Sequence, residues 1–342
     1  MSTAATDTQA LPGVTYILTA YNHARFAEQA LASAFNQDYP GRIEFIIIDD
    51  GSKDDTAAII KHCVSLRPDR EIVDLSDGLN RGLVTNINRA IRQTSGEIIF
   101  TQSCDDVAHP NRISTFVRFY QNNPQIKACY GGVRKIDENG VLSGGVYVVE
   151  DPTHPLSEAG NMPIGNGANE SCRRSMIQEL GYLEELRCVA EDCQISLLGH
   201  VSGGIGYLPD ITVDYRIHGA NWSAAGEEAS RRPFNYSWWE YSARSCFDNA
   251  RAMDALLRRP AVAKRCDPVA LRHLARYVGA NLRKQTVNYH AFFPQPGDRF
   301  YSLVFTSGLS FGKIALSLAV RLFQARGLRF LLWARRCLTK AA

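Results

Sequence analysis

Residues 43–56 read IEFIIIDDGSKDDT, an apolar run that changes within two residues into adjacent carboxylates, a glycine and a serine. A continuous apolar run of this length is typical of a strand that is buried on both faces of a sheet. Ending it on Asp49 and Asp50 is costly, because like charges repel and burial disfavours the charged form. The pair therefore either builds a turn, as Asp, Gly and Ser commonly do, or it has a function.

The segments around this stretch alternate between strand and helix patterns. VTYILTA at 14–20 reads as a buried strand, and apolar residues then recur at helical spacing as far as residue 35. The same alternation continues through strand-like segments at 71–75 and 96–102, each followed by a helical pattern. This order predicts an α/β fold with a mainly parallel sheet, helices on both faces and a ligand site at the carboxyl ends of the strands.

A second apolar strand also ends on two acids. The stretch IIFTQSCDDVAHP at 98–110 brings Asp105 and Asp106 to the same predicted edge as the first pair. So much negative charge in one place requires a cation or several good donors. Carboxylates are ligands for Mg²⁺ or Mn²⁺ that bridge substrate phosphates, whereas no GxGxxG motif or P-loop is present. The residues alone therefore indicate a metal-bound nucleoside diphosphate.

Three stretches at 17–56, 80–113 and 189–223 together resemble a family 2 glycosyltransferase with the GT-A fold, over roughly residues 13–223. The resemblance implies that Thr19, Tyr21 and Asp50 line the nucleotide pocket, with Asp50 approaching the base. It also implies that Asp105 and Asp106 end the metal-binding acidic motif, with Asp105 as the direct ligand. Many members have Asp-x-Asp-Asp where this chain has Ser103-Cys104-Asp105-Asp106, so the metal geometry stays open.

A third acidic pair, Glu191 and Asp192, precedes an apolar helical run. From the residues alone it is equally well explained as a helix N-terminus stabilised by acids, an effect of about 0.3–1 kcal/mol. The resemblance implies that the pair provides the general base, with Asp192 in the usual position and Glu191 as the alternative. An acceptor hydroxyl that attacks a sugar must lose its proton, and a metal stabilises the departing diphosphate. Together these imply in-line displacement with inversion.

The stretch DYRIHGANWS at 214–223 contains Arg216 and His218. The resemblance implies that it closes over the diphosphate and that His218 contacts the metal or a phosphate. Alternatively, Arg216 forms an ion pair with Asp210 or Asp214, and His218 is structural.

Asn80 and Arg81 precede a predicted helix, where they could face phosphate or ribose or simply form its entry turn. The candidate nucleotide-binding residues are therefore Thr19, Tyr21, Asp50, Asn80, Arg81, Asp105 and Arg216, and the candidate metal ligands are Asp105, Asp106 and His218.

The charge of the chain is unevenly distributed. Residues 1–230 carry 18 Lys and Arg against 30 Asp and Glu, whereas residues 231–342 carry 20 against 5. We expect an N-terminal tail at 1–12, a GT-A domain at 13–225 and a helical, basic region at 226–342. The segment from residue 316 onward has an apolar and a basic face, which predicts a helix that packs on the protein or lies on an anionic membrane.

Cysteine usage and the N-terminus indicate the compartment. Nine cysteines without a CxxC pair favour a reducing environment, the N-terminus lacks the features of a signal peptide, and no apolar stretch approaches the ~18 residues of a membrane span. We expect a cytoplasmic protein, either free or peripheral on the inner face of the membrane.

The leading hypothesis is a metal-dependent, inverting hexosyltransferase that moves a sugar from a nucleotide-sugar donor, with UDP as the expected carrier, to a glycan or lipid-linked acceptor of a cell-surface polysaccharide. A sugar nucleotidyltransferase would need a Gly-rich basic loop after the first strand, where this chain has TAYNHARF at 19–26. A non-catalytic glycan- or nucleotide-binding protein with this fold is the second alternative, and nucleic-acid binding is not expected.

Overall fold

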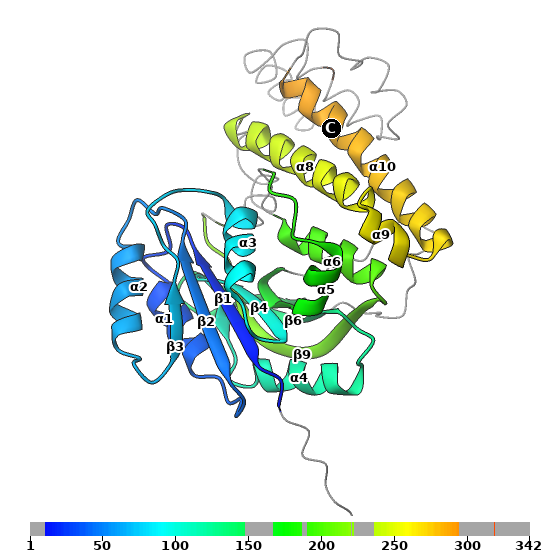
Figure 1. Ribbon diagram of the computed structural model, residues 1–342. Coiled ribbons are helices and arrows are strands. Elements are labelled where there is room, and N and C mark those ends of the chain that lie inside the picture. The colour runs from blue at the N-terminus through cyan, green and yellow to red at the C-terminus, as the bar shows by residue number, and fades with distance from the viewer. Residues whose placement is uncertain are drawn as a thin grey trace, which may run out of the picture. The chain divides into compact units, whose positions relative to one another are not determined.

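The computed structural model describes residues 11–147, 167–186, 190–219, 221, 236–293 and 318 (Figure 1). The chain divides into two compact units. The first comprises Met1–Pro152, Gly165–Tyr182 and Ser202–Arg216, and the second comprises Thr153–Ile164, Leu183–Val201 and Ile217–Ala342. Residues 183–201 thus cluster with the second unit, although the sequence placed them inside the expected 13–225 domain.

The first unit is built on one mixed sheet, whose strands in the described residues follow the order β3-β2-β1-β4-β8-β6-β9-β5, with β7 paired to β6. The strands are β1 (Val14–Ala20), β2 (Ile43–Asp49), β3 (Glu71–Asp74), β4 (Ile98–Ser103), β5 (Val107–Ala108), β6 (Ala128–Ile136), β7 (Leu142–Tyr147), β8 (Glu170–Arg173) and β9 (Ile205–Arg216).

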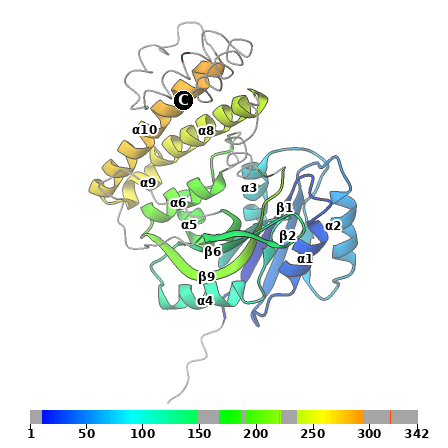
Figure 2. The same cartoon turned by 180° about the vertical axis from the view of Figure 1, so that it is seen from behind.

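The predicted parallel core of this sheet is confirmed by the pairing of β1, β2, β3 and β4. Ala20 of β1 is level with Asp49, and Thr19 is level with Ser103, so the carboxyl ends of three strands meet at one edge. The helices between them are α1 (Ala27–Phe35), α2 (Thr56–Ser65) and α3 (Leu83–Gln93), and α4 (Arg112–Asn122) follows β5. Figures 1 and 2 show α3 on the opposite face of the sheet from α1 and α2.

The remaining strands make the sheet mixed. β8 is antiparallel to both β4 and β6, and β5 is antiparallel to β9. β6 and β7 form an antiparallel hairpin. η1 (Gly167–Asn169) and α5 (Arg174–Leu180) flank β8.

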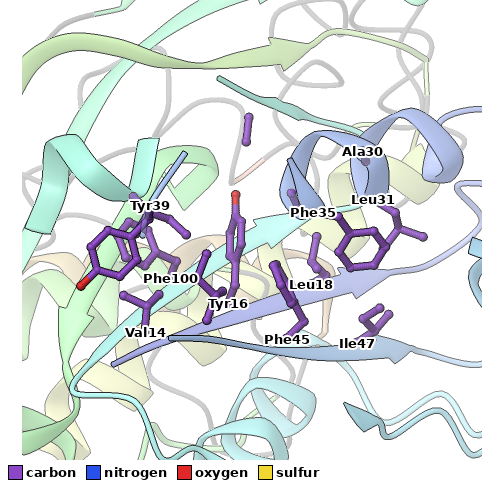
Figure 3. Close-up of a cluster of buried hydrophobic side chains, with 14 of the residues drawn as sticks. Val14, Tyr16, Leu18, Ala30, Leu31, Phe35, Tyr39, Phe45, Ile47 and Phe100 are labelled. Carbon is purple, nitrogen blue, oxygen red and sulfur yellow. The ribbon is translucent and has the colours of Figure 1, made fainter. Parts of the chain in front are cut away.

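The main hydrophobic core fills the face of β1 that carries Tyr16 and Leu18. Figure 3 shows Phe35 of α1 and Phe45 of β2 side by side over this face, with their ring centroids 5.1 Å apart in an edge-on arrangement. Both rings are almost completely buried, so truncating either to Ala would cost about 3–5 kcal/mol. The core rigidly supports the strands whose ends carry the acids.

The described part of the second unit is helical, as the sequence predicted for the region after residue 226. It contains α6 (Glu191–Val201), α8 (Tyr236–Leu257), α9 (Pro260–Arg265) and α10 (Pro268–Phe292). Asp267 caps α10 by accepting hydrogen bonds from the N–H groups of Val269 and Ala270. Apart from Leu318, the expected amphipathic segment from residue 316 onward lies outside the described residues. None of the described helices is long and apolar enough to span a bilayer.

Candidate active site at the carboxyl edge of the parallel strands

The first acid of the opening stretch has a structural role. Asp49 is buried, and its carboxylate accepts hydrogen bonds from the backbone N–H and the hydroxyl of Ser52. Its own N–H donates to Oγ of Ser76. Asp49 therefore fixes the turn after β2, as the turn interpretation of this stretch predicted.

The second acid, Asp50, reaches across to the start of α3. Its Oδ1 accepts from the backbone N–H of Arg81 at 2.6 Å and from Nδ2 of Asn86 at 2.7 Å. The N–H of Gly82, the residue that precedes α3, lies 3.1 Å from both carboxylate oxygens. Asp50 thus stabilises a helix N-terminus, and Oδ2 is the oxygen with the greater remaining capacity to accept a hydrogen bond.

The loop after β1 is fastened to the loop after β2 through its backbone. The N–H groups of residues 22, 23 and 24 donate to side-chain oxygens of Ser52, Thr56 and Asp54 respectively. Asn22 has a φ of 56°, a left-handed conformation that Asn tolerates better than most residues. Burial opposes ionisation of Asp54, but hydrogen bonds from Thr56 and Ala24 outweigh it and lower its pKa. The two loops therefore form one rigid rim.

The same edge exposes apolar surface beside Asp50. Tyr21, the residue after β1, is 45% exposed, and Leu79 is 55% exposed. Gly51 has a φ of 69°, and a Cβ there would lie 2.8 Å from the backbone N of Asn80, so the turn and the 78–80 loop touch. An exposed aromatic ring and a carboxylate on adjoining loops are suited to binding a flat polar base.

Asn80 and Arg81 are both exposed, which makes them accessible to a ligand. The guanidinium of Arg81 forms an ion pair with Asp77 at 2.9 Å, and Arg89 contacts the same carboxylate at 3.1 Å. The hydrogen bond from Arg81 is the main cause of the lowered pKa of Asp77. This ion pair holds the Arg81 side chain against Asp77 of its own loop.

The second acidic pair follows β4 directly. Asp105 and Asp106 are 6% and 1% exposed, and Nε2 of His23, from the loop after β1, lies 3.6 Å from Oδ2 of Asp105. Burial and the neighbouring Asp105 carboxylate raise the pKa of Asp106 well above its usual range. Oδ1 of Asp106 accepts a hydrogen bond from the N–H of Arg216. The structure therefore brings His23, a residue that the sequence did not single out, to the predicted metal motif.

Arg216 is a buried side chain that braces the Asp105–Asp106 loop against α1. It is 1% exposed; its Nε donates to the carbonyl of Asp105 at 2.8 Å, and its Nη2 donates to Oε1 of Gln29 at 2.7 Å. Nη1 lies within hydrogen-bond distance of the carbonyls of residues 137 and 138 in the hairpin turn. The alternative of an ion pair with Asp214 is wrong, because Asp214 binds Arg134 and His109. Arg216 acts on the site by holding the Asp105–Asp106 loop in place.

A second buried arginine, Arg112, supports the Asp105–Asp106 loop indirectly through Gln102. Arg112 is fully buried and donates to Oδ1 of Asn169, to the hydroxyl of Tyr16 and to Oε1 of Gln102. Nε2 of Gln102 in turn donates to the carbonyl of Asp106 at 3.0 Å. Sequence reasoning missed this network, although a charged residue on the apolar face of the helix at 112–122 is the signal that could have revealed it.

The donor set fits a divalent cation that takes few ligands from the protein. In the part of the chain that the structure describes, no three His, Cys, Asp or Glu side chains are grouped closely enough to form a metal cage. Two adjacent buried carboxylates, whose mutual repulsion a cation would relieve, are nevertheless present. This matches Mg²⁺ or Mn²⁺ bound through one or two carboxylates, with phosphates and water as the other ligands.

The third acidic pair lies in the second unit, at the start of α6. Oδ1 of Asp192 accepts a hydrogen bond from the N–H of Cys193 at 2.8 Å, which is the helix-end role considered for this pair. Burial and the adjacent Asp192 carboxylate raise the pKa of Glu191 to about 8. The Asp192 carboxylate therefore disfavours ionisation of Glu191.

His218 also belongs to the second unit. Its backbone N–H donates to Oδ1 of Asn221, and its carbonyl accepts from the N–H of Asn221 at 3.1 Å. This tight turn fixes the backbone directly after β9.

The fold and the acidic strand edge define an α/β protein of the GT-A class. Two solved structures share the fold. A mannosyltransferase from Pyrobaculum calidifontis, in complex with GDP-Man and Mn²⁺, has a TM-score of 0.54 at 17% identity and covers 96% of this chain and 88% of its own. Staphylococcus aureus TarS has a TM-score of 0.55 at 15% identity and covers 95% and 91%.

Residues 15–181 match the family model for glycosyl transferase family 2, and over this region the chain belongs to that family. It is 27% identical over 199 residues to the poly-β-1,6-N-acetyl-D-glucosamine synthase of Staphylococcus epidermidis, covering 56% of this chain. It is also 26% identical over 221 residues to an uncharacterised glycosyltransferase of Haemophilus influenzae, covering 61%. The chain spans 47% of the length of the first relative and 66% of the second.

Proposed function

We propose that the protein is a metal-dependent, inverting glycosyltransferase that moves a sugar from a nucleotide-sugar donor to a glycan or lipid-linked acceptor in cell-surface polysaccharide synthesis. The observation that carries the proposal is the edge where Asp50 and the Asp105–Asp106 pair follow neighbouring strands of a family 2 domain. The matched synthase acts in polysaccharide formation by its name, which supports this class of product.

The nucleotide half of the donor fits the rim around Asp50. Oδ2 of Asp50 accepts a hydrogen bond from the base or ribose, and the exposed ring of Tyr21 stacks on the base. Thr19 lies level with Ser103 between the two acidic loops, where it contacts the ligand. Asn80 and Arg81 border the same site, and Arg81 exchanges part of its pairing with Asp77 for a phosphate.

The diphosphate is placed at Asp105 and Asp106. A Mg²⁺ or Mn²⁺ ion held by Asp105, with Asp106 and His218 as further candidates, would neutralise the charge that develops on the leaving diphosphate. Arg216 keeps the Asp105 backbone fixed through its buried hydrogen bonds. In our proposal Arg216 therefore positions the ligand loop, and its expected direct contact with the diphosphate becomes secondary.

The acceptor needs a base, and Asp192 is the leading candidate, with Glu191 as the alternative. The amide donor from Cys193 stabilises the charged form of Asp192, whereas burial favours the protonated form of Glu191 near neutral pH. A carboxylate that is ionised at the working pH is able to take the hydroxyl proton as the glycosidic bond forms.

The rim also disfavours a sugar nucleotidyltransferase. Such an enzyme would use a flexible Gly-rich loop after the first strand to cradle phosphates with backbone N–H groups. Here the N–H groups of Asn22, His23 and Ala24 already bind the side chains of the next loop. They are therefore unavailable for that task.

The experiment that tests the proposal is incubation of the full chain with a panel of UDP- and GDP-sugars and Mn²⁺, scored for release of nucleoside diphosphate. We expect release with one donor, its loss in EDTA and its recovery on adding Mn²⁺. Donor binding without turnover, with every acceptor class supplied, would favour a non-catalytic binding protein. Vesicle sedimentation with and without residues 312–342 tests whether the basic C-terminal segment attaches the protein to anionic membranes.

A further inference from the structure

Three arginines of α10 surround a hollow in the second unit. Arg272, Arg276 and Arg283 line an open cavity of about 430 Å³ together with Ala275. Their positions fall on one face of the helix, because 3.6 residues make a turn. A Cβ on Gly279 would lie 3.6 Å from Nη1 of Arg283, so this guanidinium folds back over the glycine. Ala275 and Gly279 therefore leave the helix face beside the arginines without bulky side chains.

The three arginines of the hollow lack the acidic partners that other arginines of the second unit have. Arg251 pairs with Asp248 and Arg258 with Asp254, each one turn away on α8. Arg259 pairs with Glu184. By contrast, no ion pair connects the three arginines of the hollow to any residue that the structure describes.

The sequence cannot supply many partners either. α10 contains no Asp or Glu, and Asp298 is the single acid that follows Asp267 in the whole chain. Like charges four residues apart, such as Arg272 and Arg276, destabilise a helix. A solvated helix face would usually intersperse acids among these positions, so the repulsion indicates a site for an external anion.

We propose that this hollow binds a phosphate-bearing ligand through the three guanidinium groups. The planar fork of arginine donates two parallel hydrogen bonds to phosphate oxygens. The exposed positions of all three side chains leave the hollow open to solvent. The phosphate belongs either to a phospholipid headgroup or to a soluble phosphorylated molecule. Nucleic acid is disfavoured, because none of the lining residues that the structure describes offers an aromatic ring for base stacking.

The test is titration calorimetry of the full chain with inorganic pyrophosphate in EDTA. We expect saturable binding that weakens roughly tenfold in each of Arg272→Gln, Arg276→Gln and Arg283→Gln, because each removes a charge-assisted contact. Lys284→Gln is the matched control: it removes the same charge from an exposed residue about 100° further round the helix. Ala275→Leu fills the hollow without changing the charge and should also weaken binding.

Two results would overturn the site: no saturable binding by the wild type, or an equal loss in Lys284→Gln and Arg276→Gln, which would reduce the effect to net charge. Vesicles of phosphatidylglycerol identify the source. If the ligand is a headgroup, Arg276→Gln lowers vesicle binding and pyrophosphate competes; if it is soluble, vesicle binding stays unchanged while pyrophosphate binding falls. The increase in nucleoside diphosphate affinity that Mn²⁺ produces over EDTA, measured on the same variants, should not change, so failure of this site leaves the proposed transferase function intact.

Discussion

The backbone N–H of Arg216 donates to Oδ1 of Asp106 across 2.9 Å, although 110 residues separate the two along the chain. The guanidinium of the same residue binds the carbonyl of Asp105 and lies 4.9 Å over the ring of Phe26. One buried side chain at the end of β9 thus fixes the acidic loop after β4 to the start of α1. The predicted metal motif depends on this brace as well as on its own carboxylates.

Replacing Arg216 tests whether it braces the loop or binds phosphate. Arg216→Lys keeps the charge but cannot satisfy the several oxygens that the guanidinium reaches, so we expect the melting temperature to fall by several degrees without any ligand. Affinity for nucleoside diphosphate with Mn²⁺ should fall as well. A phosphate ligand without a structural role would instead leave the melting curve unchanged, and Arg118→Lys, the same substitution at an exposed position of α4, is the control.

Replacing Asp50 should have two separable effects. Asp50→Ala removes the acceptor at the start of α3 and should cost about 0.5–2 kcal/mol of unfolding free energy, as the loss of a helix cap does. It should also weaken binding of nucleoside diphosphate in calorimetry. Asp55→Asn removes the same charge at the start of α2, where no side-chain cap is formed, and should change neither. Unchanged nucleotide affinity in Asp50→Ala would leave Asp50 with its helix-capping role alone.

The Asp105 carboxylate should determine metal dependence. Asp105→Asn should lower the Mn²⁺-dependent affinity for nucleoside diphosphate by about 10- to 100-fold or more, because a direct ligand is lost. Asp106→Asn should impair it less, since the amide oxygen still accepts from the N–H of Arg216. The measurement is nucleotide titration in Mn²⁺ and in EDTA. Equal affinities for wild type and Asp105→Asn in Mn²⁺ would refute the ligand assignment.

The sequence predicted the parts of this fold that depend on local patterns. The strands at 14–20 and 43–49 and their parallel pairing follow from continuous apolar runs, and the acids follow the strand ends. The partners of Arg216 could not be predicted, because they are backbone carbonyls 79 and 111 positions away that carry no sequence signal. The place of Arg112 on an apolar helix face indicates its burial, but not which groups it binds. The place of Asp50 at the N-terminus of α3 escaped prediction for the same reason.

A general-base role and a helix-end role for the pair Glu191 and Asp192 predict different results. If Asp192 is the base, Asp192→Asn should fold normally, because its amide oxygen still accepts the N–H of Cys193. Transfer at saturating donor should nevertheless fall by about 10²–10⁴-fold, the usual contribution of a positioned base. If Asp192 serves only the helix end, Asp192→Asn should lose at most about 1 kcal/mol of stability and keep its turnover.

The pH dependence then separates the two acids. The pKa of Glu191 is raised from 4.5 to about 8, so the stability that its protonated form contributes is present at pH values below 4.5 and is lost as the pH rises through about 8. Relative to Glu191→Gln, the wild type should therefore lose melting temperature across this interval. Transfer should rise over the same interval if Glu191 is the base, and Glu191→Gln should then abolish both transfer and the rise. If Asp192 is the base, Glu191→Gln should stay active and leave the rise of transfer with pH unchanged below about pH 8, because Glu191 is already neutral there. A transfer rate that is independent of pH in all three proteins would remove this pair from the mechanism.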